Sequence, residues 1–317
     1  MYRTYGSPDV VACEEVEKPI PGDDEVLIEV RAASANQYDL HLMKGKPYLM
    51  RLMTGLRKPK STRPGRDVSG NVVAVGASVR QFKPGDEVFG FSPGAFAEYA
   101  CTKESRLAHK PANVSFENAA AVPMAAITAL QGLRDPGRIG RGDRVLIDGA
   151  SGGVGTFAVQ IAKSFGAHVT AVCSTHNVAI ARSIGADRVI DYTQEDFTQH
   201  DERYDLIFAA NAYHSILDYR RALTRDGRYV IAGGGWRQVL QSLLFGPLLS
   251  LVGSKKMRIA SARIQQSDLA LLSQLLESGK VAPVIDSRYP LSGVAEALRH
   301  LDEGHAKGKV LITFGAI

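Results

Sequence analysis

A glycine-rich turn at residues 149–155 constrains the fold of this chain more than any other feature of its sequence. Residues 144–148 form a short apolar run before the turn, and residues 156–165 have the apolar spacing of a helix after it. In this setting, backbone N–H groups at the start of the helix can bind the pyrophosphate of a dinucleotide. Gly152 leaves room for the pyrophosphate, and Gly155 allows close packing of the helix on the strand. An ordinary tight turn is the alternative, but the flanking elements favour a dinucleotide site with contacts from Ser151, Gly152, Gly153 and Val154.

The chain after residue 112 alternates short apolar runs with helical segments. Such alternation is typical of a parallel sheet with helices on both faces and right-handed connections. Ser115 and Asn118 are placed to begin a helix that runs to about residue 132. We predict that residues 113–283 form a doubly wound α/β domain of the Rossmann type. The expected strands are residues 144–148, 168–173, 188–191, 204–209 and 228–232, and residues 177–184 are expected to be helical.

Residues 1–112 have a different sequence pattern, in which short predicted strands are separated by glycine and proline residues. Residues 25–30, 70–75 and 87–90 are the expected strands, and this pattern is typical of a β-rich, barrel-like domain. The pattern returns at the other end of the sequence, where residues 292–301 read as an amphipathic helix and residues 309–314 as a strand. We therefore expect residues 284–317 to complete the domain that residues 1–112 begin.

The composition is that of a soluble globular protein, because 45% of the residues are apolar and 22% are charged. The net charge of +5 is spread along the chain without a dense basic stripe, so no nucleic-acid partner is predicted. The three cysteines lie far apart and form no C-x-x-C pair, which argues against a disulfide scaffold. No apolar run reaches the about 18 residues of a membrane span, and no signal segment is recognised. We expect a cytoplasmic protein without integral membrane contact.

The segment after the second strand bears on the choice between NADPH and NADH. A site selective for NADH places Asp or Glu there, to bind the ribose 2′-hydroxyl. This chain has no carboxylate in residues 173–177, and Ser174, Thr175 and Asn177 can donate hydrogen bonds to a 2′-phosphate. These side chains also suit a helix cap, and the two roles are compatible. We predict NADPH, although the loop holds no Lys or Arg to neutralise the phosphate.

Segments along nearly the whole chain resemble the quinone oxidoreductase and zeta-crystallin branch of the medium-chain dehydrogenases/reductases. Residues 65–76 follow the pattern G-x-D-x-x-G-x-V and then V-G, and residues 84–88 supply the G-D-x-V turn that follows. Residues 94–99 are similar to the G-x-x-A-E-Y segment of the branch. Further matching segments are residues 119–123, 128–130, 148–155, 185–187, 191–192 and 308–310.

The resemblance implies a GroES-like, β-rich catalytic domain that is split around an inserted Rossmann domain, with cofactor and substrate between the two. Zinc alcohol dehydrogenases of the same superfamily have Cys where this chain has Asn36, and Gly-His-Glu where it has Gly65, Arg66 and Asp67. The four-cysteine structural zinc loop is missing as well. Zinc requires a set of Cys, His or carboxylate ligands, so the resemblance implies a zinc-free enzyme.

The resemblance also suggests roles for single residues. Asn36 is similar to the family's asparagine near the nicotinamide ribose, where it would position the cofactor or donate to a substrate carbonyl; its alternative is a turn cap. Tyr48 lies where related reductases place a tyrosine that donates a hydrogen bond or relays a proton. Asp39 is expected to orient nearby backbone. Further cofactor contacts are expected from Thr128, Tyr192, Asn211, Gly233, Gly234 and Lys309. The alternative for Thr128 is a hydroxyl bonded within its own helix, and the alternative for Tyr192 is core packing. The alternative for Lys309 is a solvated side chain.

The expected reaction is hydride transfer from NADPH to quinones or α,β-unsaturated carbonyls, because these acceptors are electrophilic without a metal. Two alternatives stay open: a zinc-free NADP-dependent alcohol or ketone dehydrogenase, and a non-catalytic NADPH-binding protein. A homodimer is expected. Residues 236–258 combine apolar residues with a basic end and suit a lid or subunit surface, in preference to a peripheral membrane contact.

Overall fold

The computed structural model describes residues 1–315, which separate into two compact units. Unit 1 contains Met1–Met124, Ile264–Ser278 and the described part of the segment that begins at Pro283. Unit 2 contains Ala125–Arg263 and Gly279–Ala282. Each unit has its own sheet, so the two are described separately.

Unit 1 is built on a seven-stranded sheet whose central strand is β1 (Glu25–Ala35). β1 pairs antiparallel with β2 (Asp67–Val75) and with β13 (Lys309–Thr313), which confirms that the last predicted strand joins the N-terminal sheet. The order is β12-β13-β1-β2-β3-β5, and β4 pairs with β1. The remaining strands are β3 (Glu87–Phe91), β4 (Tyr99–Lys103), β5 (Leu107–His109) and β12 (Ile285–Pro290).

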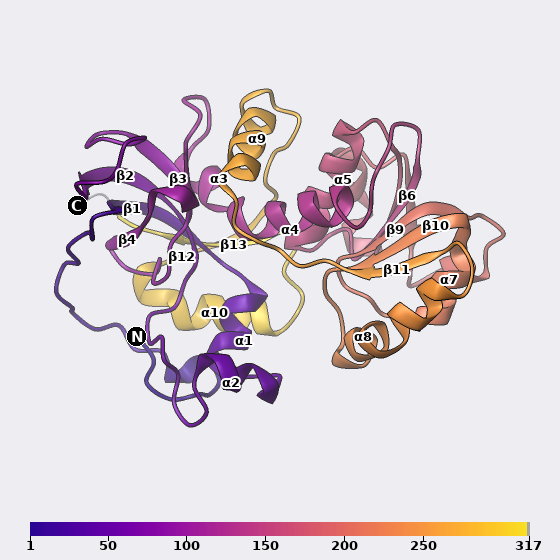
Figure 1. Ribbon diagram of the computed structural model, residues 1–317, viewed down its shortest axis with the longest axis horizontal. Coiled ribbons are helices and arrows are strands. Elements are labelled where there is room, and N and C mark those ends of the chain that lie inside the picture. The colour runs from indigo at the N-terminus through magenta and orange to yellow at the C-terminus, as the bar shows by residue number, and fades with distance from the viewer. Residues whose placement is uncertain (316–317) are drawn as a thin grey trace. The chain divides into compact units, whose positions relative to one another are not determined.

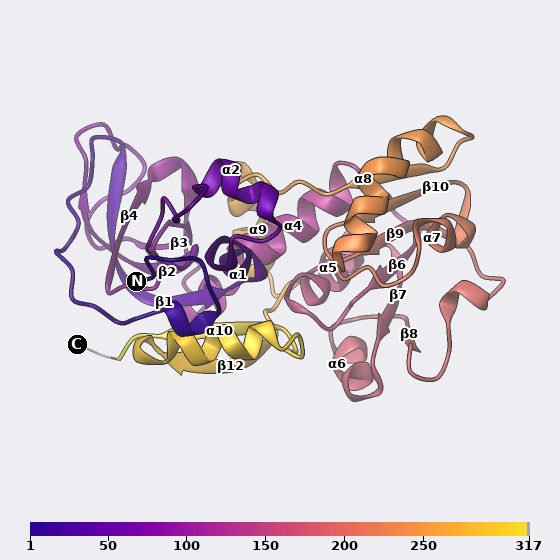
Figure 2. The ribbon, with the colours of Figure 1, turned by 90° about the horizontal axis from the view of Figure 1, so that it is seen from below.

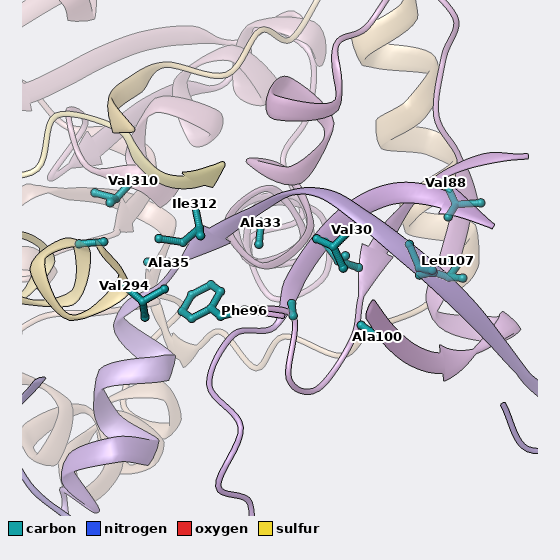
Figure 3. Packing of buried hydrophobic residues seen from close by; sticks show 14 of the residues in the cluster. Val30, Ala33, Ala35, Val88, Phe96, Ala100, Leu107, Val294, Val310 and Ile312 are labelled. Atoms are coloured by element: carbon teal, nitrogen blue, oxygen red, sulfur yellow. The ribbon is translucent and has the colours of Figure 1, made fainter. Parts of the chain in front are cut away.

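The core of unit 1 lies between this sheet and the helix α10 (Val294–Asp302). Figure 3 shows side chains from β1 and β13, among them Val30 and Ile312, in one apolar cluster with Phe96 and Val294. Burial of each large side chain contributes about 1.5–3 kcal/mol. The other helical segments of unit 1 are α1 (Gln37–Lys44), α2 (Arg51–Thr54), α3 (Phe116–Ala120), α9 (Gln266–Glu277), η1 (Pro8–Val10), η2 (Tyr48–Met50), η3 (Glu104–Arg106) and η6 (Leu291–Gly293).

The single helix predicted from Ser115 to about residue 132 is wrong in one respect, because the structure divides it into α3 and α4 (Pro123–Arg134). Ser115 accepts a hydrogen bond from the backbone N–H of Asn118 at 3.1 Å and caps α3 as expected. Proline has no N–H to continue a helical ladder and suits the first position of a new helix, so the break falls before Pro123.

Unit 2 is a parallel six-stranded sheet in the order β11-β10-β9-β6-β7-β8. The order reverses between β6 (Arg144–Asp148) and β9 (Tyr204–Ala209), which is typical of a doubly wound sheet. Figures 1 and 2 show α7 and α8 on one side of this sheet and α5 and α6 on the other. The other strands are β7 (His168–Cys173), β8 (Arg188–Asp191), β10 (Leu223–Ile231) and β11 (Lys256–Ile259). The other helical segments are α5 (Gly153–Ser164), α6 (Val178–Ser183), α7 (Ile216–Ala222), α8 (Trp236–Leu251), η4 (Thr175–Asn177) and η5 (Phe197–Gln199).

The units divide the chain differently from the predicted domains of residues 1–112 with 284–317 and residues 113–283. The helix α9 belongs to unit 1, because Gln266 and Ser273 donate hydrogen bonds to backbone carbonyls of Leu107 and His109 in β5. Both contacts join residues more than 150 positions apart, which local patterns cannot reveal. Within residues 1–315, no helix is long and apolar enough to cross a membrane.

Candidate active site

The glycine-rich turn connects β6 to α5, as the sequence predicts. Gly149 adopts a φ of +78°, and the backbone N–H of Ala150 donates to the carbonyl of Val172 in the neighbouring strand at 3.0 Å. Gly152 is the N-cap of α5, and no side chain caps the helix start there. The first N–H groups of α5 are thus presented for an anion at the C-terminal edge of a parallel sheet.

The two fingerprint glycines are needed for different reasons. A Cβ on Gly155 would lie 2.0 Å from the carbonyl oxygen of Gly149, so the close approach of helix and strand requires glycine. A Cβ on Gly152 would meet nothing nearer than that same oxygen at 3.7 Å, so the protein itself leaves this space open. The open space at the helix start fits a pyrophosphate, and the turn therefore suits a dinucleotide.

The end of β7 brings the three predicted polar side chains to this turn. The amide Nδ2 of Asn177 donates to Oγ of Ser151 and to Oγ of Ser174, each at 3.1 Å. Neither Ser174 nor Asn177 makes a side-chain cap, and Thr175 is exposed beside Thr193. Among the described residues, Oδ1 of Asn177 is buried without a hydrogen-bond partner. An unpaired acceptor and hydroxyl groups at this position fit a ribose that bears hydroxyl and phosphate groups.

Other predicted cofactor residues surround the same edge of the sheet. Asn211 follows β9 and lies against the turn, because a Cβ on Gly149 would come within 2.7 Å of its Cβ. Gly233 and Gly234 follow β10, and Gly234 forms an isolated bridge with Ala212. Tyr192 follows β8 and is 61% exposed, so it is no core residue. Thr128 lies within α4 and is partly buried.

A buried carboxyl group that the sequence did not single out lies beneath the turn. Asp148 is the last residue of β6, and it accepts a hydrogen bond from the hydroxyl of Tyr219. The same hydroxyl accepts from the backbone N–H of Tyr213 at 3.0 Å, and the ring stacks on Tyr229 at 4.6 Å. Burial raises the pKa of Asp148 to about 6, although the bond from Tyr219 opposes this rise. The pair links the start of the turn to the loop after β9.

Unit 1 contributes a second polar cluster, at one end of β1. Because β1 is antiparallel to both β2 and β13, its C-terminal end lies beside their first residues, Asp67 and Lys309. Asn36 follows β1 directly and is the N-cap of α1. Its backbone N–H donates to Oδ2 of Asp39 at 2.9 Å, which confirms that Asp39 orients backbone.

The side chain of Asn36 is held on both sides. Its Nδ2 donates to Oδ2 of Asp67 at 3.0 Å and to the carbonyl of Ser34 at 3.3 Å, and its Oδ1 accepts from Nζ of Lys309 at 2.5 Å. Both hydrogens of Nδ2 are thus used, and Oδ1 is bound to the ammonium group of Lys309. The side chain also belongs to a capping box with Asp39 at the start of α1. Donation to a substrate carbonyl would first require one of the two Nδ2 bonds to open.

Asp67 and Lys309 form a buried ion pair, with 3.4 Å between Oδ2 and Nζ and side chains only 0% and 3% exposed. Lys309 is therefore not the solvated lysine that the sequence left open. Burial raises the pKa of Asp67, and Lys309 opposes this rise; burial lowers the pKa of Lys309, and Asp67 opposes that fall. Asp67 also accepts from Oγ of Ser34 at 2.9 Å and from the backbone N–H of Met124 at 3.0 Å. These bonds fix the position of the carboxylate.

Tyr48 is the exposed member of the predicted site residues in unit 1. It begins η2, its side chain is 66% exposed, and the guanidinium of Arg51 lies 4.9 Å from its ring centroid. The same guanidinium lies over Tyr5 at 4.3 Å, so Arg51 contacts both rings. The tyrosine hydroxyl can donate to a ligand that reaches this segment.

The residues present at the end of β1 do not fit a catalytic zinc ion. The position that would supply a thiolate holds the amide of Asn36, and Lys309 brings a buried cation to Asp67. Within residues 1–315, no three His, Cys, Asp or Glu side chains are grouped as metal ligands. An ammonium group occupies the polar contacts of Asn36 and Asp67 instead.

Sequence patterns could have indicated only some of these residues. Asp67 belongs to the G-x-D motif and Asp148 is a charged residue at the end of a buried strand, so both carried a local signal. Ser34 lies inside a strand and Tyr219 inside a helix, and nothing in their local sequence distinguishes them from structural residues. Their roles come from contacts over 33 and 71 positions.

Comparisons with known proteins agree with this architecture. Residues 22–112 match the alcohol dehydrogenase GroES-like domain, and residues 184–312 match the zinc-binding dehydrogenase family. The chain is 37% identical over 326 residues to 2-methylene-furan-3-one reductase of Solanum lycopersicum, covering 98% of this chain and 77% of that protein. It is 34% identical over 329 residues to the chloroplastic quinone-oxidoreductase QR1 of Triphysaria versicolor, covering 98% and 96% of the two chains.

Two further similarities extend over nearly the whole chain. The chloroplastic NADPH-dependent alkenal/one oxidoreductase of Arabidopsis thaliana is 34% identical over 327 residues, covering 98% of this chain and 78% of that protein. The structure of the quinone oxidoreductase from Coxiella burnetii superposes with a TM-score of 0.85 at 27% identity, covering 98% of this chain and 97% of that one. The chain therefore belongs to the medium-chain dehydrogenase/reductase family, in the branch of quinone oxidoreductases and alkenal/one reductases.

Proposed function

We propose that the protein reduces quinones or α,β-unsaturated carbonyls with NADPH and without zinc. The observation that carries this proposal is the buried Asn36–Asp67–Lys309 cluster of unit 1, which stands in place of metal ligands. Unit 2 separately provides an open glycine cradle at Gly152. Relatives named as quinone oxidoreductases and as an NADPH-dependent alkenal/one oxidoreductase support the same reaction.

The dinucleotide would be held by unit 2. The N–H groups at the start of α5 bind the pyrophosphate, and Ser174, Thr175 and Asn177 bind the adenosine ribose and its 2′-phosphate. The absence of a carboxylate from residues 173–177 favours NADPH over NADH, since a carboxylate would repel the phosphate. We assign further cofactor contacts to Ser151, Gly153, Val154, Thr128, Tyr192, Asn211, Gly233 and Gly234.

The acceptor would be oriented by unit 1. Bound NADPH supplies the hydride, and the protein must stabilise the negative charge that forms on the acceptor oxygen. Asn36 would position the nicotinamide ribose through its amide group, and Lys309 would hold this amide in its orientation. Tyr48 is the predicted donor to the acceptor oxygen, because its hydroxyl is exposed while Asn36 and Lys309 are already bonded.

The setting of the reaction is proposed on separate grounds. The three cysteines are free and lie apart, which fits the cytoplasm.

β11 is an edge strand whose residues Arg258 and Ile259 are exposed, so an antiparallel contact between two copies would extend the sheet in a homodimer. We also propose a domain division at residues 112/113 and 283/284 from the family resemblance, although the compact units place α9 in unit 1. Sedimentation equilibrium measures the oligomeric state directly.

The test of the proposed function is oxidation of NADPH in the presence of a small quinone and, separately, a 2-alkenal. We expect turnover of at least one acceptor, and a loss on the order of tenfold to a hundredfold in kcat/KM for Asn36→Ala. NADPH binding without turnover of either acceptor would contradict the proposal. Oxidation of simple alcohols with NADP instead would favour the dehydrogenase alternative. Chelator treatment should leave the rate unchanged.

A further inference from the structure

The helix α8 exposes its large apolar side chains and buries its small ones. Ser242 and Gly246 are its buried residues, and a Cβ on Gly246 would lie 3.6 Å from the carbonyl oxygen of Met257 in β11. The opposite face carries a continuous set of exposed apolar residues. These are Trp236, Leu240, Leu243, Leu244, Phe245, Leu248, Leu251 and Val252, with exposed fractions between 42% and 81%.

This distribution is the reverse of what a helix on a water-facing surface normally shows. From the exposed fractions, the apolar face covers on the order of 900 Å², which exceeds the largest apolar patch of a typical monomer. No charged residue occurs in residues 238–254, and the exposed residues of the helix after its first turn are leucine, phenylalanine and proline. We therefore expect this apolar face of α8 to bind another apolar surface.

The charges within the segment that contains α8 are of one sign. Residues 227–267 contain no Asp or Glu, and six residues in this stretch are basic: Arg228, Arg237, Lys255, Lys256, Arg258 and Arg263. Arg228 pairs with Asp143, but Arg237 and Arg258 are exposed. Arg220 also lies at the end of α8, where it donates to the carbonyl of Val252 at 2.8 Å and its own carbonyl accepts from Lys255.

Cations thus stand at both ends of the apolar face. A second copy of the helix would fit the face poorly, because each end of α8 would meet a cationic end of its partner in either orientation. A surface that is apolar inside and negatively charged at its rim satisfies both features. We infer that α8 docks the protein on the surface of an anionic lipid bilayer, with its apolar face in the acyl region and its cations at the headgroups.

The geometry fits a helix that lies in the plane of the membrane. Sixteen residues give a helix of about 24 Å, too short to cross a bilayer of about 30 Å. Amphipathic helices with an apolar face and Lys or Arg at its border bind in this way, and each basic residue strengthens binding to anionic lipid. Such docking goes beyond the proposed reductase activity and does not depend on it.

The sequence supplies its own reporter, because Trp236 is the only tryptophan and begins the apolar face. The full chain is mixed with vesicles of phosphatidylcholine alone, or of phosphatidylcholine with the anionic lipid phosphatidylglycerol, and the vesicles are then sedimented. We expect sedimentation with the anionic vesicles, a blue shift of Trp236 emission and protection from an aqueous quencher. High salt should weaken binding.

The decisive variant is Leu244→Glu/Leu248→Glu, which places two carboxylates on the face. We expect its binding to anionic vesicles to fall roughly tenfold or more. Ile20→Glu is the matched control, because Ile20 is 90% exposed in unit 1, outside α8. Circular dichroism melts check that each variant is folded, and NADPH oxidation with a soluble quinone is measured separately.

Two results would overturn the inference. The first is no sedimentation of the parent chain with either vesicle; if the Leu244→Glu/Leu248→Glu variant then changes the oligomeric state or the turnover of a soluble quinone, the face serves a subunit contact or a lid. The second is equal binding of the parent and this variant to anionic vesicles. Retained vesicle binding without any reductase activity would refute only the proposed function.

Discussion

Replacement of Lys309 by methionine removes the cation from a buried ion pair and leaves Asp67 without a counterion. The two side chains are 3% and 0% exposed, so water cannot take the place of the ammonium group. Removal of one partner from a buried pair costs about 3–5 kcal/mol. For a chain of 317 residues that loss corresponds to a fall of roughly 4–8 °C in the melting temperature.

The pH dependence of this loss identifies its cause. Burial already raises the pKa of Asp67 in the folded protein, and loss of Lys309 raises it further. A carboxyl whose pKa is higher in the folded state binds protons more tightly when folded, so stability falls as pH rises above the unfolded value of about 3.9. The deficit of Lys309→Met should therefore be small near pH 5 and reach its full size by pH 8.

Melting by circular dichroism at both pH values measures this effect. Lys103→Met is the control, because Lys103 pairs with Asp24 on the surface at 2.6 Å and its loss should cost at most about 1 kcal/mol. The double variant Asp67→Asn/Lys309→Met removes both charges and should recover much of the stability. A Lys309→Met protein that melts with the parent at pH 8, or that shows the same deficit at both pH values, would refute the reasoning.

Three further outcomes are expected. Gly152→Ala should melt like the parent but weaken NADPH binding in a fluorescence titration. Gly155→Ala should lower both thermal stability and NADPH affinity, because its Cβ would lie 2.0 Å from a carbonyl oxygen. Equal melting temperatures for the two variants would contradict this difference. Ser174→Asp should lower the ratio of kcat/KM for NADPH to that for NADH by roughly tenfold or more, and an unchanged ratio would remove this residue from the phosphate site. Tyr219→Phe leaves the carboxylate of Asp148 and a backbone N–H unpaired at a cost of about 1–3 kcal/mol; the missing bond raises the pKa of Asp148 above about 6, so the melting deficit should grow from pH 5 to pH 8.

Local patterns were sufficient for most of unit 2. The run into Gly149 and the strand at residues 168–173 lie where the sequence predicts them, because buried parallel strands are short, apolar and bounded by turns. The helix α7 and the strand β11 were not predicted. In unit 1, the helix predicted from Ser115 is broken before Pro123, where proline interrupts an Ala-rich run. Residues 236–251 were noted as unusual but not assigned as a helix, because their large apolar residues face away from the protein.

Long-range contacts set the limit of prediction in unit 1 and at the candidate site. The sequence named Asn36 and Lys309, but it did not show that each binds the other and Asp67. Burial of Lys309 depends on β13 lying next to β1, and no local pattern reports the environment of a lysine at the start of a strand. Asn36 and Lys309 could thus be predicted as site residues, but the buried ion pair between Lys309 and Asp67 could not.

The partnership of β1 with β13 also bears on how the protein is made. Lys309 and Asn36 are separated by 273 positions, so β1 leaves the ribosome long before the strand that covers its edge. Residues 125–263 can close their own sheet during that interval, while β1 keeps unpaired backbone groups exposed. A chain in synthesis can therefore carry a closed sheet in unit 2 while residues 32–35 of β1 still lack the partner strand β13.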